Sequence, residues 1–310
     1  MKHVFIDGSA GTTGLRILER LAGRMDIQLI TLPEEKRKDI QARREALNDA
    51  DAAVLCLPDD AARVAVSLVE NPRTVLIDTS TAHRTHPEWT YGFAELPGQR
   101  EKIVASRRIA NPGCHATGFI VLVAPLVREG LLDAGTALSC FSLTGYSGGG
   151  KKMIAEYEAE GRSALLDAPR QYGLTQSHKH LPEMQAVCGL AAPPVFCPIV
   201  APYYAGMEVT VPLFAQQLKG DLEDLKRVYA AYYASRIVHF DGGEAEAGFL
   251  SAGAYAGRDD LSVTVQGNAE RILLIARFDN LGKGASGAAL QNLNLATGAP
   301  ETTGLVLGHE

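Results

Sequence analysis

The chain has 310 residues, of which 46% are hydrophobic and 21% charged, and its 31 glycines and 15 prolines are spread along the sequence. This composition is that of a globular protein with a large core, and it excludes fibrous and disordered classes. The length predicts two domains or one large α/β unit. The net charge is −6 and no long basic run is present, so we expect no nucleic-acid partner.

The N-terminal residues lead directly into an apolar pattern at Val4–Phe5–Ile6, without the features of a signal peptide. No segment approaches the roughly 20 apolar residues that span a bilayer. We therefore expect a soluble, cytoplasmic protein with no membrane partner. The cysteines are odd in number, far apart and never in a CxxC pair, which argues against a disulfide framework and against a zinc site. They are Cys56, Cys114, Cys140, Cys188 and Cys197.

The first hundred residues alternate short apolar runs with helical stretches, a pattern typical of a doubly wound parallel sheet. Helices are predicted at Thr12–Leu21 and Asp59–Val69, the second capped by Asp59 or Asp60. Strands that are buried on both faces are predicted at Val4–Ile6, Ile27–Leu32, Ala53–Leu57, Thr74–Ile77 and Ile103–Ala105.

The pattern changes after Asn111–Pro112–Gly113, where a second domain is expected to begin. Met207–Phe214 and Arg271–Phe278 alternate apolar and polar residues, as strands of a half-exposed antiparallel sheet do. Helices are predicted again at Asp221–Ala234 and Ala285–Ala296. The predicted fold class is therefore α/β, with a Rossmann-type sheet followed by a second domain.

A glycine-rich loop with the spacing GxxGxxG follows the first predicted strand and opens the first helix. Backbone N–H groups at a helix N-terminus attract an anion, so this context favours a dinucleotide phosphate site. A tight strand-to-helix turn without a ligand is the structural alternative. The predicted cofactor-binding residues of the loop are Gly8, Ser9, Gly11, Thr12, Thr13 and Gly14.

The residues after the second strand leave the choice of nicotinamide cofactor open. An acidic residue there binds the ribose 2′-hydroxyl of NAD, whereas a basic residue accommodates the 2′-phosphate of NADP. In this chain Glu34 and Glu35 precede Lys36, Arg37 and Lys38. A solvated face is the structural alternative for the basic run.

Cys114 lies at or just before the start of an apolar helical stretch, Phe119–Val127. The partial positive charge and N–H donors of a helix N-terminus stabilise a thiolate and can hold an oxyanion. The sequence therefore predicts a nucleophilic thiol at Cys114, whereas the other four cysteines are expected to be small buried hydrophobes.

A nucleophile needs a base, and two histidines and a carboxylate lie close together at His178, His180 and Glu183. Two histidines two residues apart in an extended stretch point to the same side, so both are expected to face one site. Glu183 is expected to support His180. A metal site is the alternative, but no third ligand stands at a recognisable spacing, so no metal is predicted.

Further stretches are suited to binding. Asp78–Arg84 follows the fourth predicted strand, where open α/β sheets bind ligands, and the Arg84 guanidinium suits a phosphate group. An exposed salt bridge is the alternative for Arg84. The glycine-rich loops Gly145–Lys151 and Asn280–Gly287 allow backbone to approach a ligand, with a hinge and a helix N-terminus as their respective alternatives.

The motifs at Asn111–Cys114, Asp78–Arg84 and His178–Glu183 resemble those of the N-acetyl-γ-glutamyl-phosphate reductases of arginine biosynthesis, in the shorter form of that family. The resemblance implies a Rossmann domain, a catalytic and oligomerisation α+β domain similar to those of aspartate-semialdehyde and glyceraldehyde-phosphate dehydrogenases, and a C-terminal helix that returns to the first domain. These parts correspond to 1–113, 114–283 and 284–310. It also implies an NADP-dependent enzyme that forms a homo-oligomer, a dimer or tetramer.

Carried over by position, the resemblance makes Cys114 the nucleophile, His180 the general base and Glu183 its support. The loop after the second strand departs from the family's long form, because Pro33–Arg37 stands where that form commonly has a loop rich in serine and arginine. The implied substrate contacts are Arg84, His178, Asn111 and Ser147, and the implied cofactor contacts outside the glycine loop are Pro58, Ser80, Gly148, Asn280, Lys283 and Gly284.

The implied reaction begins with attack of Cys114 on an acyl phosphate, which is the small-molecule substrate. Phosphate departs to leave a thioester, and NADPH reduces the thioester to the semialdehyde. The nearest alternative is an aspartate-semialdehyde dehydrogenase or a related phosphorylating aldehyde dehydrogenase. Alternatives of other classes are a non-catalytic Rossmann redox-sensing module, disfavoured by the set Cys114, His180 and Arg84, and a cysteine hydrolase, disfavoured by the glycine loop.

Overall fold

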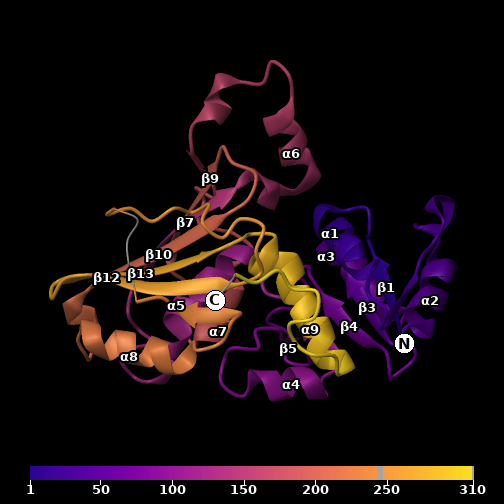
Figure 1. Cartoon of the computed structure of the whole chain (residues 1–310), viewed down its shortest axis with the longest axis horizontal. Coiled ribbons are helices and arrows are strands. Elements are labelled where there is room, and N and C mark those ends of the chain that lie inside the picture. The colour runs from indigo at the N-terminus through magenta and orange to yellow at the C-terminus, as the bar shows by residue number, and fades with distance from the viewer. Residues whose placement is uncertain (243–246, 309–310) are drawn as a thin grey trace. The chain divides into compact units, whose positions relative to one another are not determined.

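The computed structural model describes residues 1–242 and 247–308, and the chain forms two compact units (Figure 1). The first unit contains Met1–Pro112 and Ala285–Leu305, and the second contains Gly113–Gly284 together with 306–308. The predicted C-terminal segment 284–310 includes residues 309 and 310, which lie outside the described residues. The division into two units rests on contacts between residues, which do not show what each unit does. The dinucleotide-binding and catalytic roles of the predicted segments therefore stay predictions.

The first unit is built on a parallel sheet with the strand order β2-β1-β3-β4-β6-β5. Its strands are short and apolar, as expected for strands covered on both faces. They are β1 (Lys2–Asp7), β2 (Ile27–Ile30), β3 (Ala52–Leu55), β4 (Val75–Asp78), β5 (Thr90–Tyr91) and β6 (Arg108–Ala110).

Alternate residues of these strands enter two separate cores. Val4 and Ile6 of β1 pack with residues of α1 (Thr12–Leu21), α4 (Gln99–Ala105) and α9 (Gly287–Thr297). Phe5 packs in the other core, with residues of α2 (Ile40–Asp49) and α3 (Asp59–Ser67). Helices on both faces of one parallel sheet confirm the predicted doubly wound arrangement.

Two local predictions in this unit are wrong. Ile103–Ala105 belongs to helix α4, and the strand lies after it, at β6. Ile103 is fully buried while Val104 is half exposed, and an apolar run of three residues cannot distinguish a strand from one buried helical face. The N-cap position of α3 is Pro58, so Asp59 and Asp60 lie in the first turn instead of capping the helix.

The second unit is built on a mixed sheet with the strand order β11-β12-β13-β10-β7-β9-β8. β10 and β13 are antiparallel neighbours, as predicted, but β9 runs parallel to β7 and β11 runs parallel to β12, so the sheet is not antiparallel throughout. The strands are β7 (Ser139–Gly145), β8 (Arg170–Gln171), β9 (Val195–Ala201), β10 (Met207–Phe214), β11 (Val238–Phe240), β12 (Leu261–Gly267) and β13 (Arg271–Phe278).

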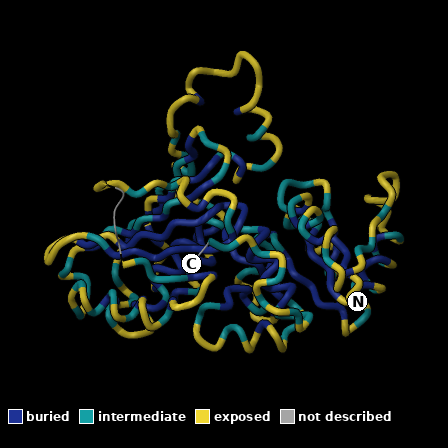
Figure 2. Tube along the Cα trace, viewed as in Figure 1, coloured by how far each residue is buried: buried dark blue, intermediate teal, exposed yellow. Residues whose placement is uncertain are grey.

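Helices cover one face of this sheet. α5 (Cys114–Arg128) packs on β10 and β13, and α7 (Leu181–Cys188) and α8 (Leu222–Tyr232) pack on α5. α5 is therefore buried nearly all round, whereas β10 alternates buried and partly exposed residues up to Leu213 (Figure 2). The remaining α-helix of this unit, among the described residues, is α6 (Gly150–Glu158). Cys114 is the first residue of α5 and therefore lies at the N-terminus of a buried helix.

Candidate active site

The glycine loop lies between β1 and α1, as predicted. Gly8 has φ +88°, and a Cβ there would lie 2.3 Å from the backbone oxygen of Cys56. A Cβ on Gly14 would lie 2.5 Å from the backbone oxygen of Gly8. Gly11 is the N-cap of α1 and provides no side-chain cap for the N–H groups of the first turn. Ser9, Thr12 and Thr13 complete a loop that can hold a phosphate with backbone donors.

A cavity of about 700 Å³ adjoins this loop in the first unit. Gly8, Ser9 and Ala10 line one part of it, and the segment after β2 lines another with both acidic and basic side chains. The cavity wall also includes a buried ion pair, in which the Arg43 guanidinium donates to the Asp7 carboxylate at 2.7 and 3.1 Å. The size of the cavity, its cationic side chains and its phosphate loop fit the adenosine portion of a dinucleotide. The charged side chains after β2 that line the cavity are Glu34, Glu35, Arg37 and Lys38.

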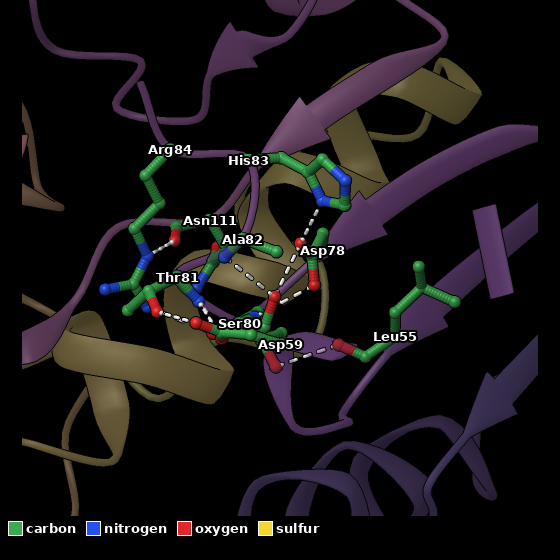
Figure 3. Close-up of polar contacts among 10 residues, drawn as sticks. Leu55, Asp59, Asp78, Ser80, Thr81, Ala82, His83, Arg84 and Asn111 are labelled. Atoms are coloured by element: carbon green, nitrogen blue, oxygen red, sulfur yellow. Dashed lines mark hydrogen bonds and ion pairs between the residues drawn. The ribbon is translucent and has the colours of Figure 1, made fainter. Parts of the chain in front are cut away.

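The loop after β4 is held by a dense hydrogen-bond network (Figure 3). Asp78 is fully buried, and its carboxylate accepts from both the backbone N–H and the hydroxyl of Ser80. The same carboxylate lies 2.6 Å from Nδ1 of His83, whose ring stacks on Trp89 at 4.2 Å. The Asp59 carboxylate accepts from the N–H and hydroxyl of Thr81. Hydrogen bonds to Asp78 and Asp59 therefore hold the side chains of this loop in place.

Arg84 lies at the end of this loop and is partly buried. Its Nε donates to the backbone oxygen of Asn111 at 2.9 Å, and Nη2 donates to the backbone oxygen of Thr79 at 3.0 Å. The side chain of Asn111 donates to the backbone oxygen of Ala285 and accepts from Asn292. These contacts fix the direction of the Arg84 guanidinium, while the phosphate role of Arg84 and the substrate role of Asn111 stay predictions.

Cys114 is the first residue of α5, is partly exposed and forms no disulfide. Gly113 is the N-cap, with no side-chain cap, so the first-turn N–H groups and the helix dipole act at the position of the thiol. Burial raises the pKa of Cys140 and of Cys188, which keeps both thiols protonated. The prediction that the other four cysteines are buried is confirmed for Cys140 and Cys188 but is wrong for Cys56 and Cys197, which are partly exposed, as Cys114 is. Cys114 differs from both in its position at the N-terminus of a helix.

The histidine cluster lies in the same unit as Cys114. The prediction that His178 and His180 lie in an extended stretch is wrong, because they lie in a turn that leads into α7. Their rings are nevertheless only 4.8 Å apart, because the backbone N–H of His180 folds back to Nδ1 of His178 at 3.2 Å. Glu183 is buried, and its carboxylate accepts from the N–H of Gly113 at 3.2 Å. Glu183 therefore ties α7 to the residue before Cys114, and its support of His180 stays a prediction.

Two residues that sequence reasoning missed complete this cluster. His115 is buried, and its ring lies 5.7 Å from that of His178 and 5.6 Å from that of His180. Nε2 of His115 lies 2.6 Å from the hydroxyl of Tyr172. A histidine at the start of an otherwise apolar helix is a signal that could have identified His115, but nothing local in the sequence marks Tyr172.

The remaining predicted contacts fall into two groups. In the second unit Asn280 links two loops, because its Nδ2 donates to Ser147 Oγ at 3.0 Å and its Oδ1 accepts from Gly206 N–H. Gly148 lies beside Asn280, and a Cβ on Gly284 would lie 2.9 Å from the Cβ of Cys114. In the first unit the predicted cofactor contacts outside the glycine loop, Pro58 and Ser80, follow the carboxyl ends of β3 and β4. Lys283 of the second unit is buried, and Pro58 of the first unit is the N-cap of α3.

Within residues 1–242 and 247–308 the structure shows no cluster of three or more histidine, cysteine or acidic side chains that could bind a metal ion. In the same ranges no helix has the length and apolar character needed to cross a membrane.

The fold and the thiol site together define a class of protein. Residues 114–280 match the family model described as semialdehyde dehydrogenase, dimerisation domain. The aspartate semialdehyde dehydrogenase of Francisella tularensis has a TM-score of 0.71 at 14% identity, covering 96% of this chain and 100% of that chain. That of Candida albicans, solved with NADP, has a TM-score of 0.68 at 14% identity, covering 96% and 99%. At this identity the similarity establishes the fold.

Relatives of higher identity define the family within this class. A protein of Pseudomonas putida named N-acetyl-gamma-glutamyl-phosphate reductase 2 is 47% identical over 312 residues, covering 97% of this chain and 98% of the relative. The N-acetyl-gamma-glutamyl-phosphate reductase of Brucella ovis is 47% identical over 305 residues, covering 95% and 98%. The chain belongs to the N-acetyl-gamma-glutamyl-phosphate reductase family, which confirms the resemblance seen in its motifs and the predicted fold class.

Proposed function

We propose that this protein reduces N-acetyl-γ-glutamyl phosphate to N-acetylglutamate semialdehyde with NADPH, releasing phosphate. The observation that carries the proposal is the partly exposed Cys114 at the N-terminus of α5, in a chain 45 to 47% identical to proteins bearing that name. The next residue, His115, has its ring 5.7 and 5.6 Å from those of His178 and His180. An acyl phosphate suits such a thiol, because the thiolate is a strong nucleophile and phosphate is a good leaving group.

In the proposed reaction His180 takes the proton of Cys114, and the sulfur then forms a bond to the acyl carbon. The first-turn N–H groups of α5 stabilise the oxyanion, and the carbon–oxygen bond to phosphate breaks to leave a thioester on Cys114. We assign Arg84 to the departing phosphate, because its guanidinium is already oriented by two backbone oxygens. His178 is assigned to substrate binding.

NADP is the proposed cofactor, with the loop from Gly8 to Gly14 on its pyrophosphate. When bound in its reduced form, it supplies the hydride that brings the thioester carbon to the aldehyde level. Arg37 and Lys38 line the cavity beside the loop, and we assign them to the ribose 2′-phosphate. His180 returns a proton as the aldehyde leaves and Cys114 is freed.

The cofactor assignment predicts that charge reversal at Arg37 and Lys38 together raises the KM for NADPH by about tenfold or more and leaves that for NADH unchanged. Lys36→Glu is the matched control, because Lys36 belongs to the same basic run but does not line the cavity. If the double variant raises the KM for NADH as much as that for NADPH, Arg37 and Lys38 do not bind the 2′-phosphate.

We also propose that the protein forms a homodimer through the face of the second sheet that is opposite α5. The matched domain model is described as a dimerisation domain, and this face exposes apolar side chains from three strands, Phe141, Val195 and Leu273. Phe141→Glu is expected to give monomers in light scattering at micromolar concentration. Leu165→Glu is the control, since Leu165 is equally apolar and 74% exposed but lies outside the sheet.

The function is tested by NADPH oxidation with N-acetyl-γ-glutamyl phosphate and, separately, with β-aspartyl phosphate. The proposal predicts turnover with the first and a kcat/KM at least about 10²-fold lower with the second, because the shorter substrate lacks the acetylated part. A preference for β-aspartyl phosphate would instead assign the protein to the aspartate-semialdehyde dehydrogenases. Thioester hydrolysis that needs no NADPH would assign it to the cysteine hydrolases.

A further inference from the structure

Cys114 lies against the turn that follows β13. A Cβ on Gly284, in that turn, would lie 2.9 Å from the Cβ of Cys114 and 3.1 Å from the backbone oxygen of Asp279. Carbon atoms that are not bonded to each other pack at about 3.5 to 4.0 Å, so a methyl group does not fit there. The Cβ of Cys114 is bonded directly to the backbone of α5 and cannot rotate away from the turn. Only glycine at position 284 therefore lets the turn lie this close to Cys114.

A buried carboxylate holds the turn in place. Asp279 is fully buried, and its Oδ1 accepts from the backbone N–H groups of Leu281 at 2.6 Å and Gly282 at 3.1 Å. Its Oδ2 accepts from the N–H of Gly257, which belongs to a separate segment of the same unit. The backbone oxygen of Asp279 accepts from the N–H of Gly284 at 3.0 Å. Because hydrogen bonds to a carboxylate are stronger than those between neutral groups, Asp279 fixes where Gly284 lies.

The first two turns of α5 are also packed closely on the sheet. Gly118 lies one turn after Cys114, and a Cβ there would lie 2.3 Å from Cγ2 of Val209 and 3.0 Å from Cε1 of Phe278. A Cβ on Gly284 would lie 3.3 Å from Cε2 of the same Phe278 ring. Such close packing leaves the helix little room to shift, so a methyl group at position 284 must displace the side chain of Cys114 or the turn itself.

We propose that Gly284 is a positioning residue for Cys114. The turn 279–284 supports the Cβ of Cys114 and thereby fixes the direction from which the sulfur meets the acyl carbon. This direction matters, because a misplacement of about 1 Å can slow a reaction by about 10²-fold. The inference rests on Cys114 as the nucleophile of the proposed function. It differs from the cofactor contact that the resemblance implies for Gly284, because the positioning role requires no NADP.

The test is the rate of phosphate release when the full-length protein is mixed with N-acetyl-γ-glutamyl phosphate without NADPH, so that the reaction stops at the thioester. Gly284→Ala is expected to lower this rate by about 10 to 100-fold, because the displaced thiol approaches the acyl carbon from a less favourable direction. Iodoacetamide labelling of Cys114 and the Kd for NADPH are each expected to change by less than about threefold. A small reagent reaches a thiol from many directions, and the N–H donors of the first turn of α5 are unchanged.

Two results with Gly284→Ala would overturn the proposal. One is a rate of phosphate release within about threefold of the wild type, which would leave Gly284 as a cofactor contact or a packing residue. The other is an equal fall in phosphate release and in iodoacetamide labelling, which would show that the thiol has lost reactivity instead of orientation.

Gly220→Ala is the matched control, because it introduces a methyl group at another tight position of the same unit. A Cβ on Gly220 would lie 2.8 Å from Oδ2 of Asp224 and 3.0 Å from Cδ2 of Leu131, and none of these residues belongs to the proposed mechanism. The variant is expected to lower the melting temperature without slowing phosphate release. If it slows phosphate release as much as Gly284→Ala does, the effect is a general one of steric disturbance and the positioning role is wrong.

Asp279→Asn tests the support of the turn without adding a methyl group. The amide keeps the size of the side chain but replaces one acceptor oxygen with a donor, so at least one of the bonds to backbone N–H groups is lost. Phosphate release is expected to slow by about 3 to 10-fold, as the loss of one hydrogen bond does. Circular dichroism identifies a variant that has not folded. If Gly284→Ala does not fold, an unchanged rate in Asp279→Asn would overturn the proposal.

The wild type separates this inference from the proposed function. Phosphate release by the wild type that neither Gly284→Ala nor Asp279→Asn slows would overturn the positioning role alone. No phosphate release by the wild type would overturn the proposed function, and the positioning role with it.

Discussion

The loop that carries Arg84 and the cluster around Cys114 are both polar and partly buried, but they are built from different groups. In the loop a carboxylate, Asp78 or Asp59, accepts from neighbouring N–H and O–H groups, so each donor is already matched. In the cluster imidazoles and a phenol lie against each other, and one of the imidazoles, that of His115, belongs to the residue after Cys114. The loop is thus suited to hold a fixed cation in place, and the cluster to move protons. This comparison predicts binding defects from substitutions in the loop, and chemical defects from substitution of Cys114 or His180 in the cluster.

The largest effect is expected from the thiol itself. Cys114→Ser replaces the nucleophile with a hydroxyl that is far less ionised, so turnover should fall by at least about 10³-fold. NADP binding should change little, because the residues assigned to NADP in the cavity lie in the first unit. Steady-state kinetics and a fluorescence titration of NADPH measure the two quantities. Activity above a few per cent of wild type would remove Cys114 from the mechanism.

The next effect separates the two histidines of the cluster. His180→Asn should lower the rate of thioester formation by about 10² to 10⁴-fold, as loss of a general base does. His178→Asn should chiefly raise the KM for the acyl phosphate, because lost ground-state contacts are seen there. Single-turnover kinetics of both variants measure the difference. The assignment of the base is wrong if His178→Asn, and not His180→Asn, slows acyl transfer.

Arg84→Ala tests the loop, and a smaller effect is expected. A charged hydrogen bond to phosphate contributes about 1.5 to 3 kcal/mol, so the KM for the acyl phosphate should rise about 10 to 100-fold. Arg44→Ala is the matched control, since Arg44 also lies in the first unit but pairs with the exposed Glu70. Equal, small effects of the two variants would make Arg84 a structural residue that only ties together Asn111 and Thr79.

The smallest effect concerns stability and pH. His115 is neutral in the folded protein, with its pKa lowered to about 3 by burial, but in the unfolded chain it titrates near 6.5. Between these values the unfolded state binds more protons, so His115 contributes a loss of stability as the pH falls below about 6.5, of about 2 kcal/mol by pH 5. Urea unfolding at pH 7.5 and 5.0 should show this loss reduced in His115→Gln. An identical pH dependence in both proteins would contradict a buried neutral imidazole.

The sequence predicts those parts of the site that depend on local patterns. The glycine loop and Cys114 each lie where a strand or turn meets a helix, so chain order alone places their backbone donors. The pairing of His178 with His180 is also local, although the turn that brings them together was not foreseen. Short apolar runs are less informative, as Ile103–Ala105 shows.

The parts that were missed depend on contacts distant in the sequence. Ser142, His115 and Tyr172 come from β7, α5 and the residue after β8, and they meet because β7 and β8 both pair with β9. The anchoring of Arg84 to the backbone oxygen of Asn111 likewise follows from the pairing of β4 with β6. Strand pairing of this kind is not encoded in any single segment.

The central claim is that Cys114 forms an acyl-enzyme with the substrate. Mass spectrometry of the protein mixed with N-acetyl-γ-glutamyl phosphate, without NADPH, tests it most directly. We expect one N-acetylglutamyl group on the peptide that contains Cys114, removed by hydroxylamine or by added NADPH, and absent in Cys114→Ser. An adduct on another residue, or turnover of the substrate with no adduct on rapid quenching, would show that Cys114 is not the nucleophile.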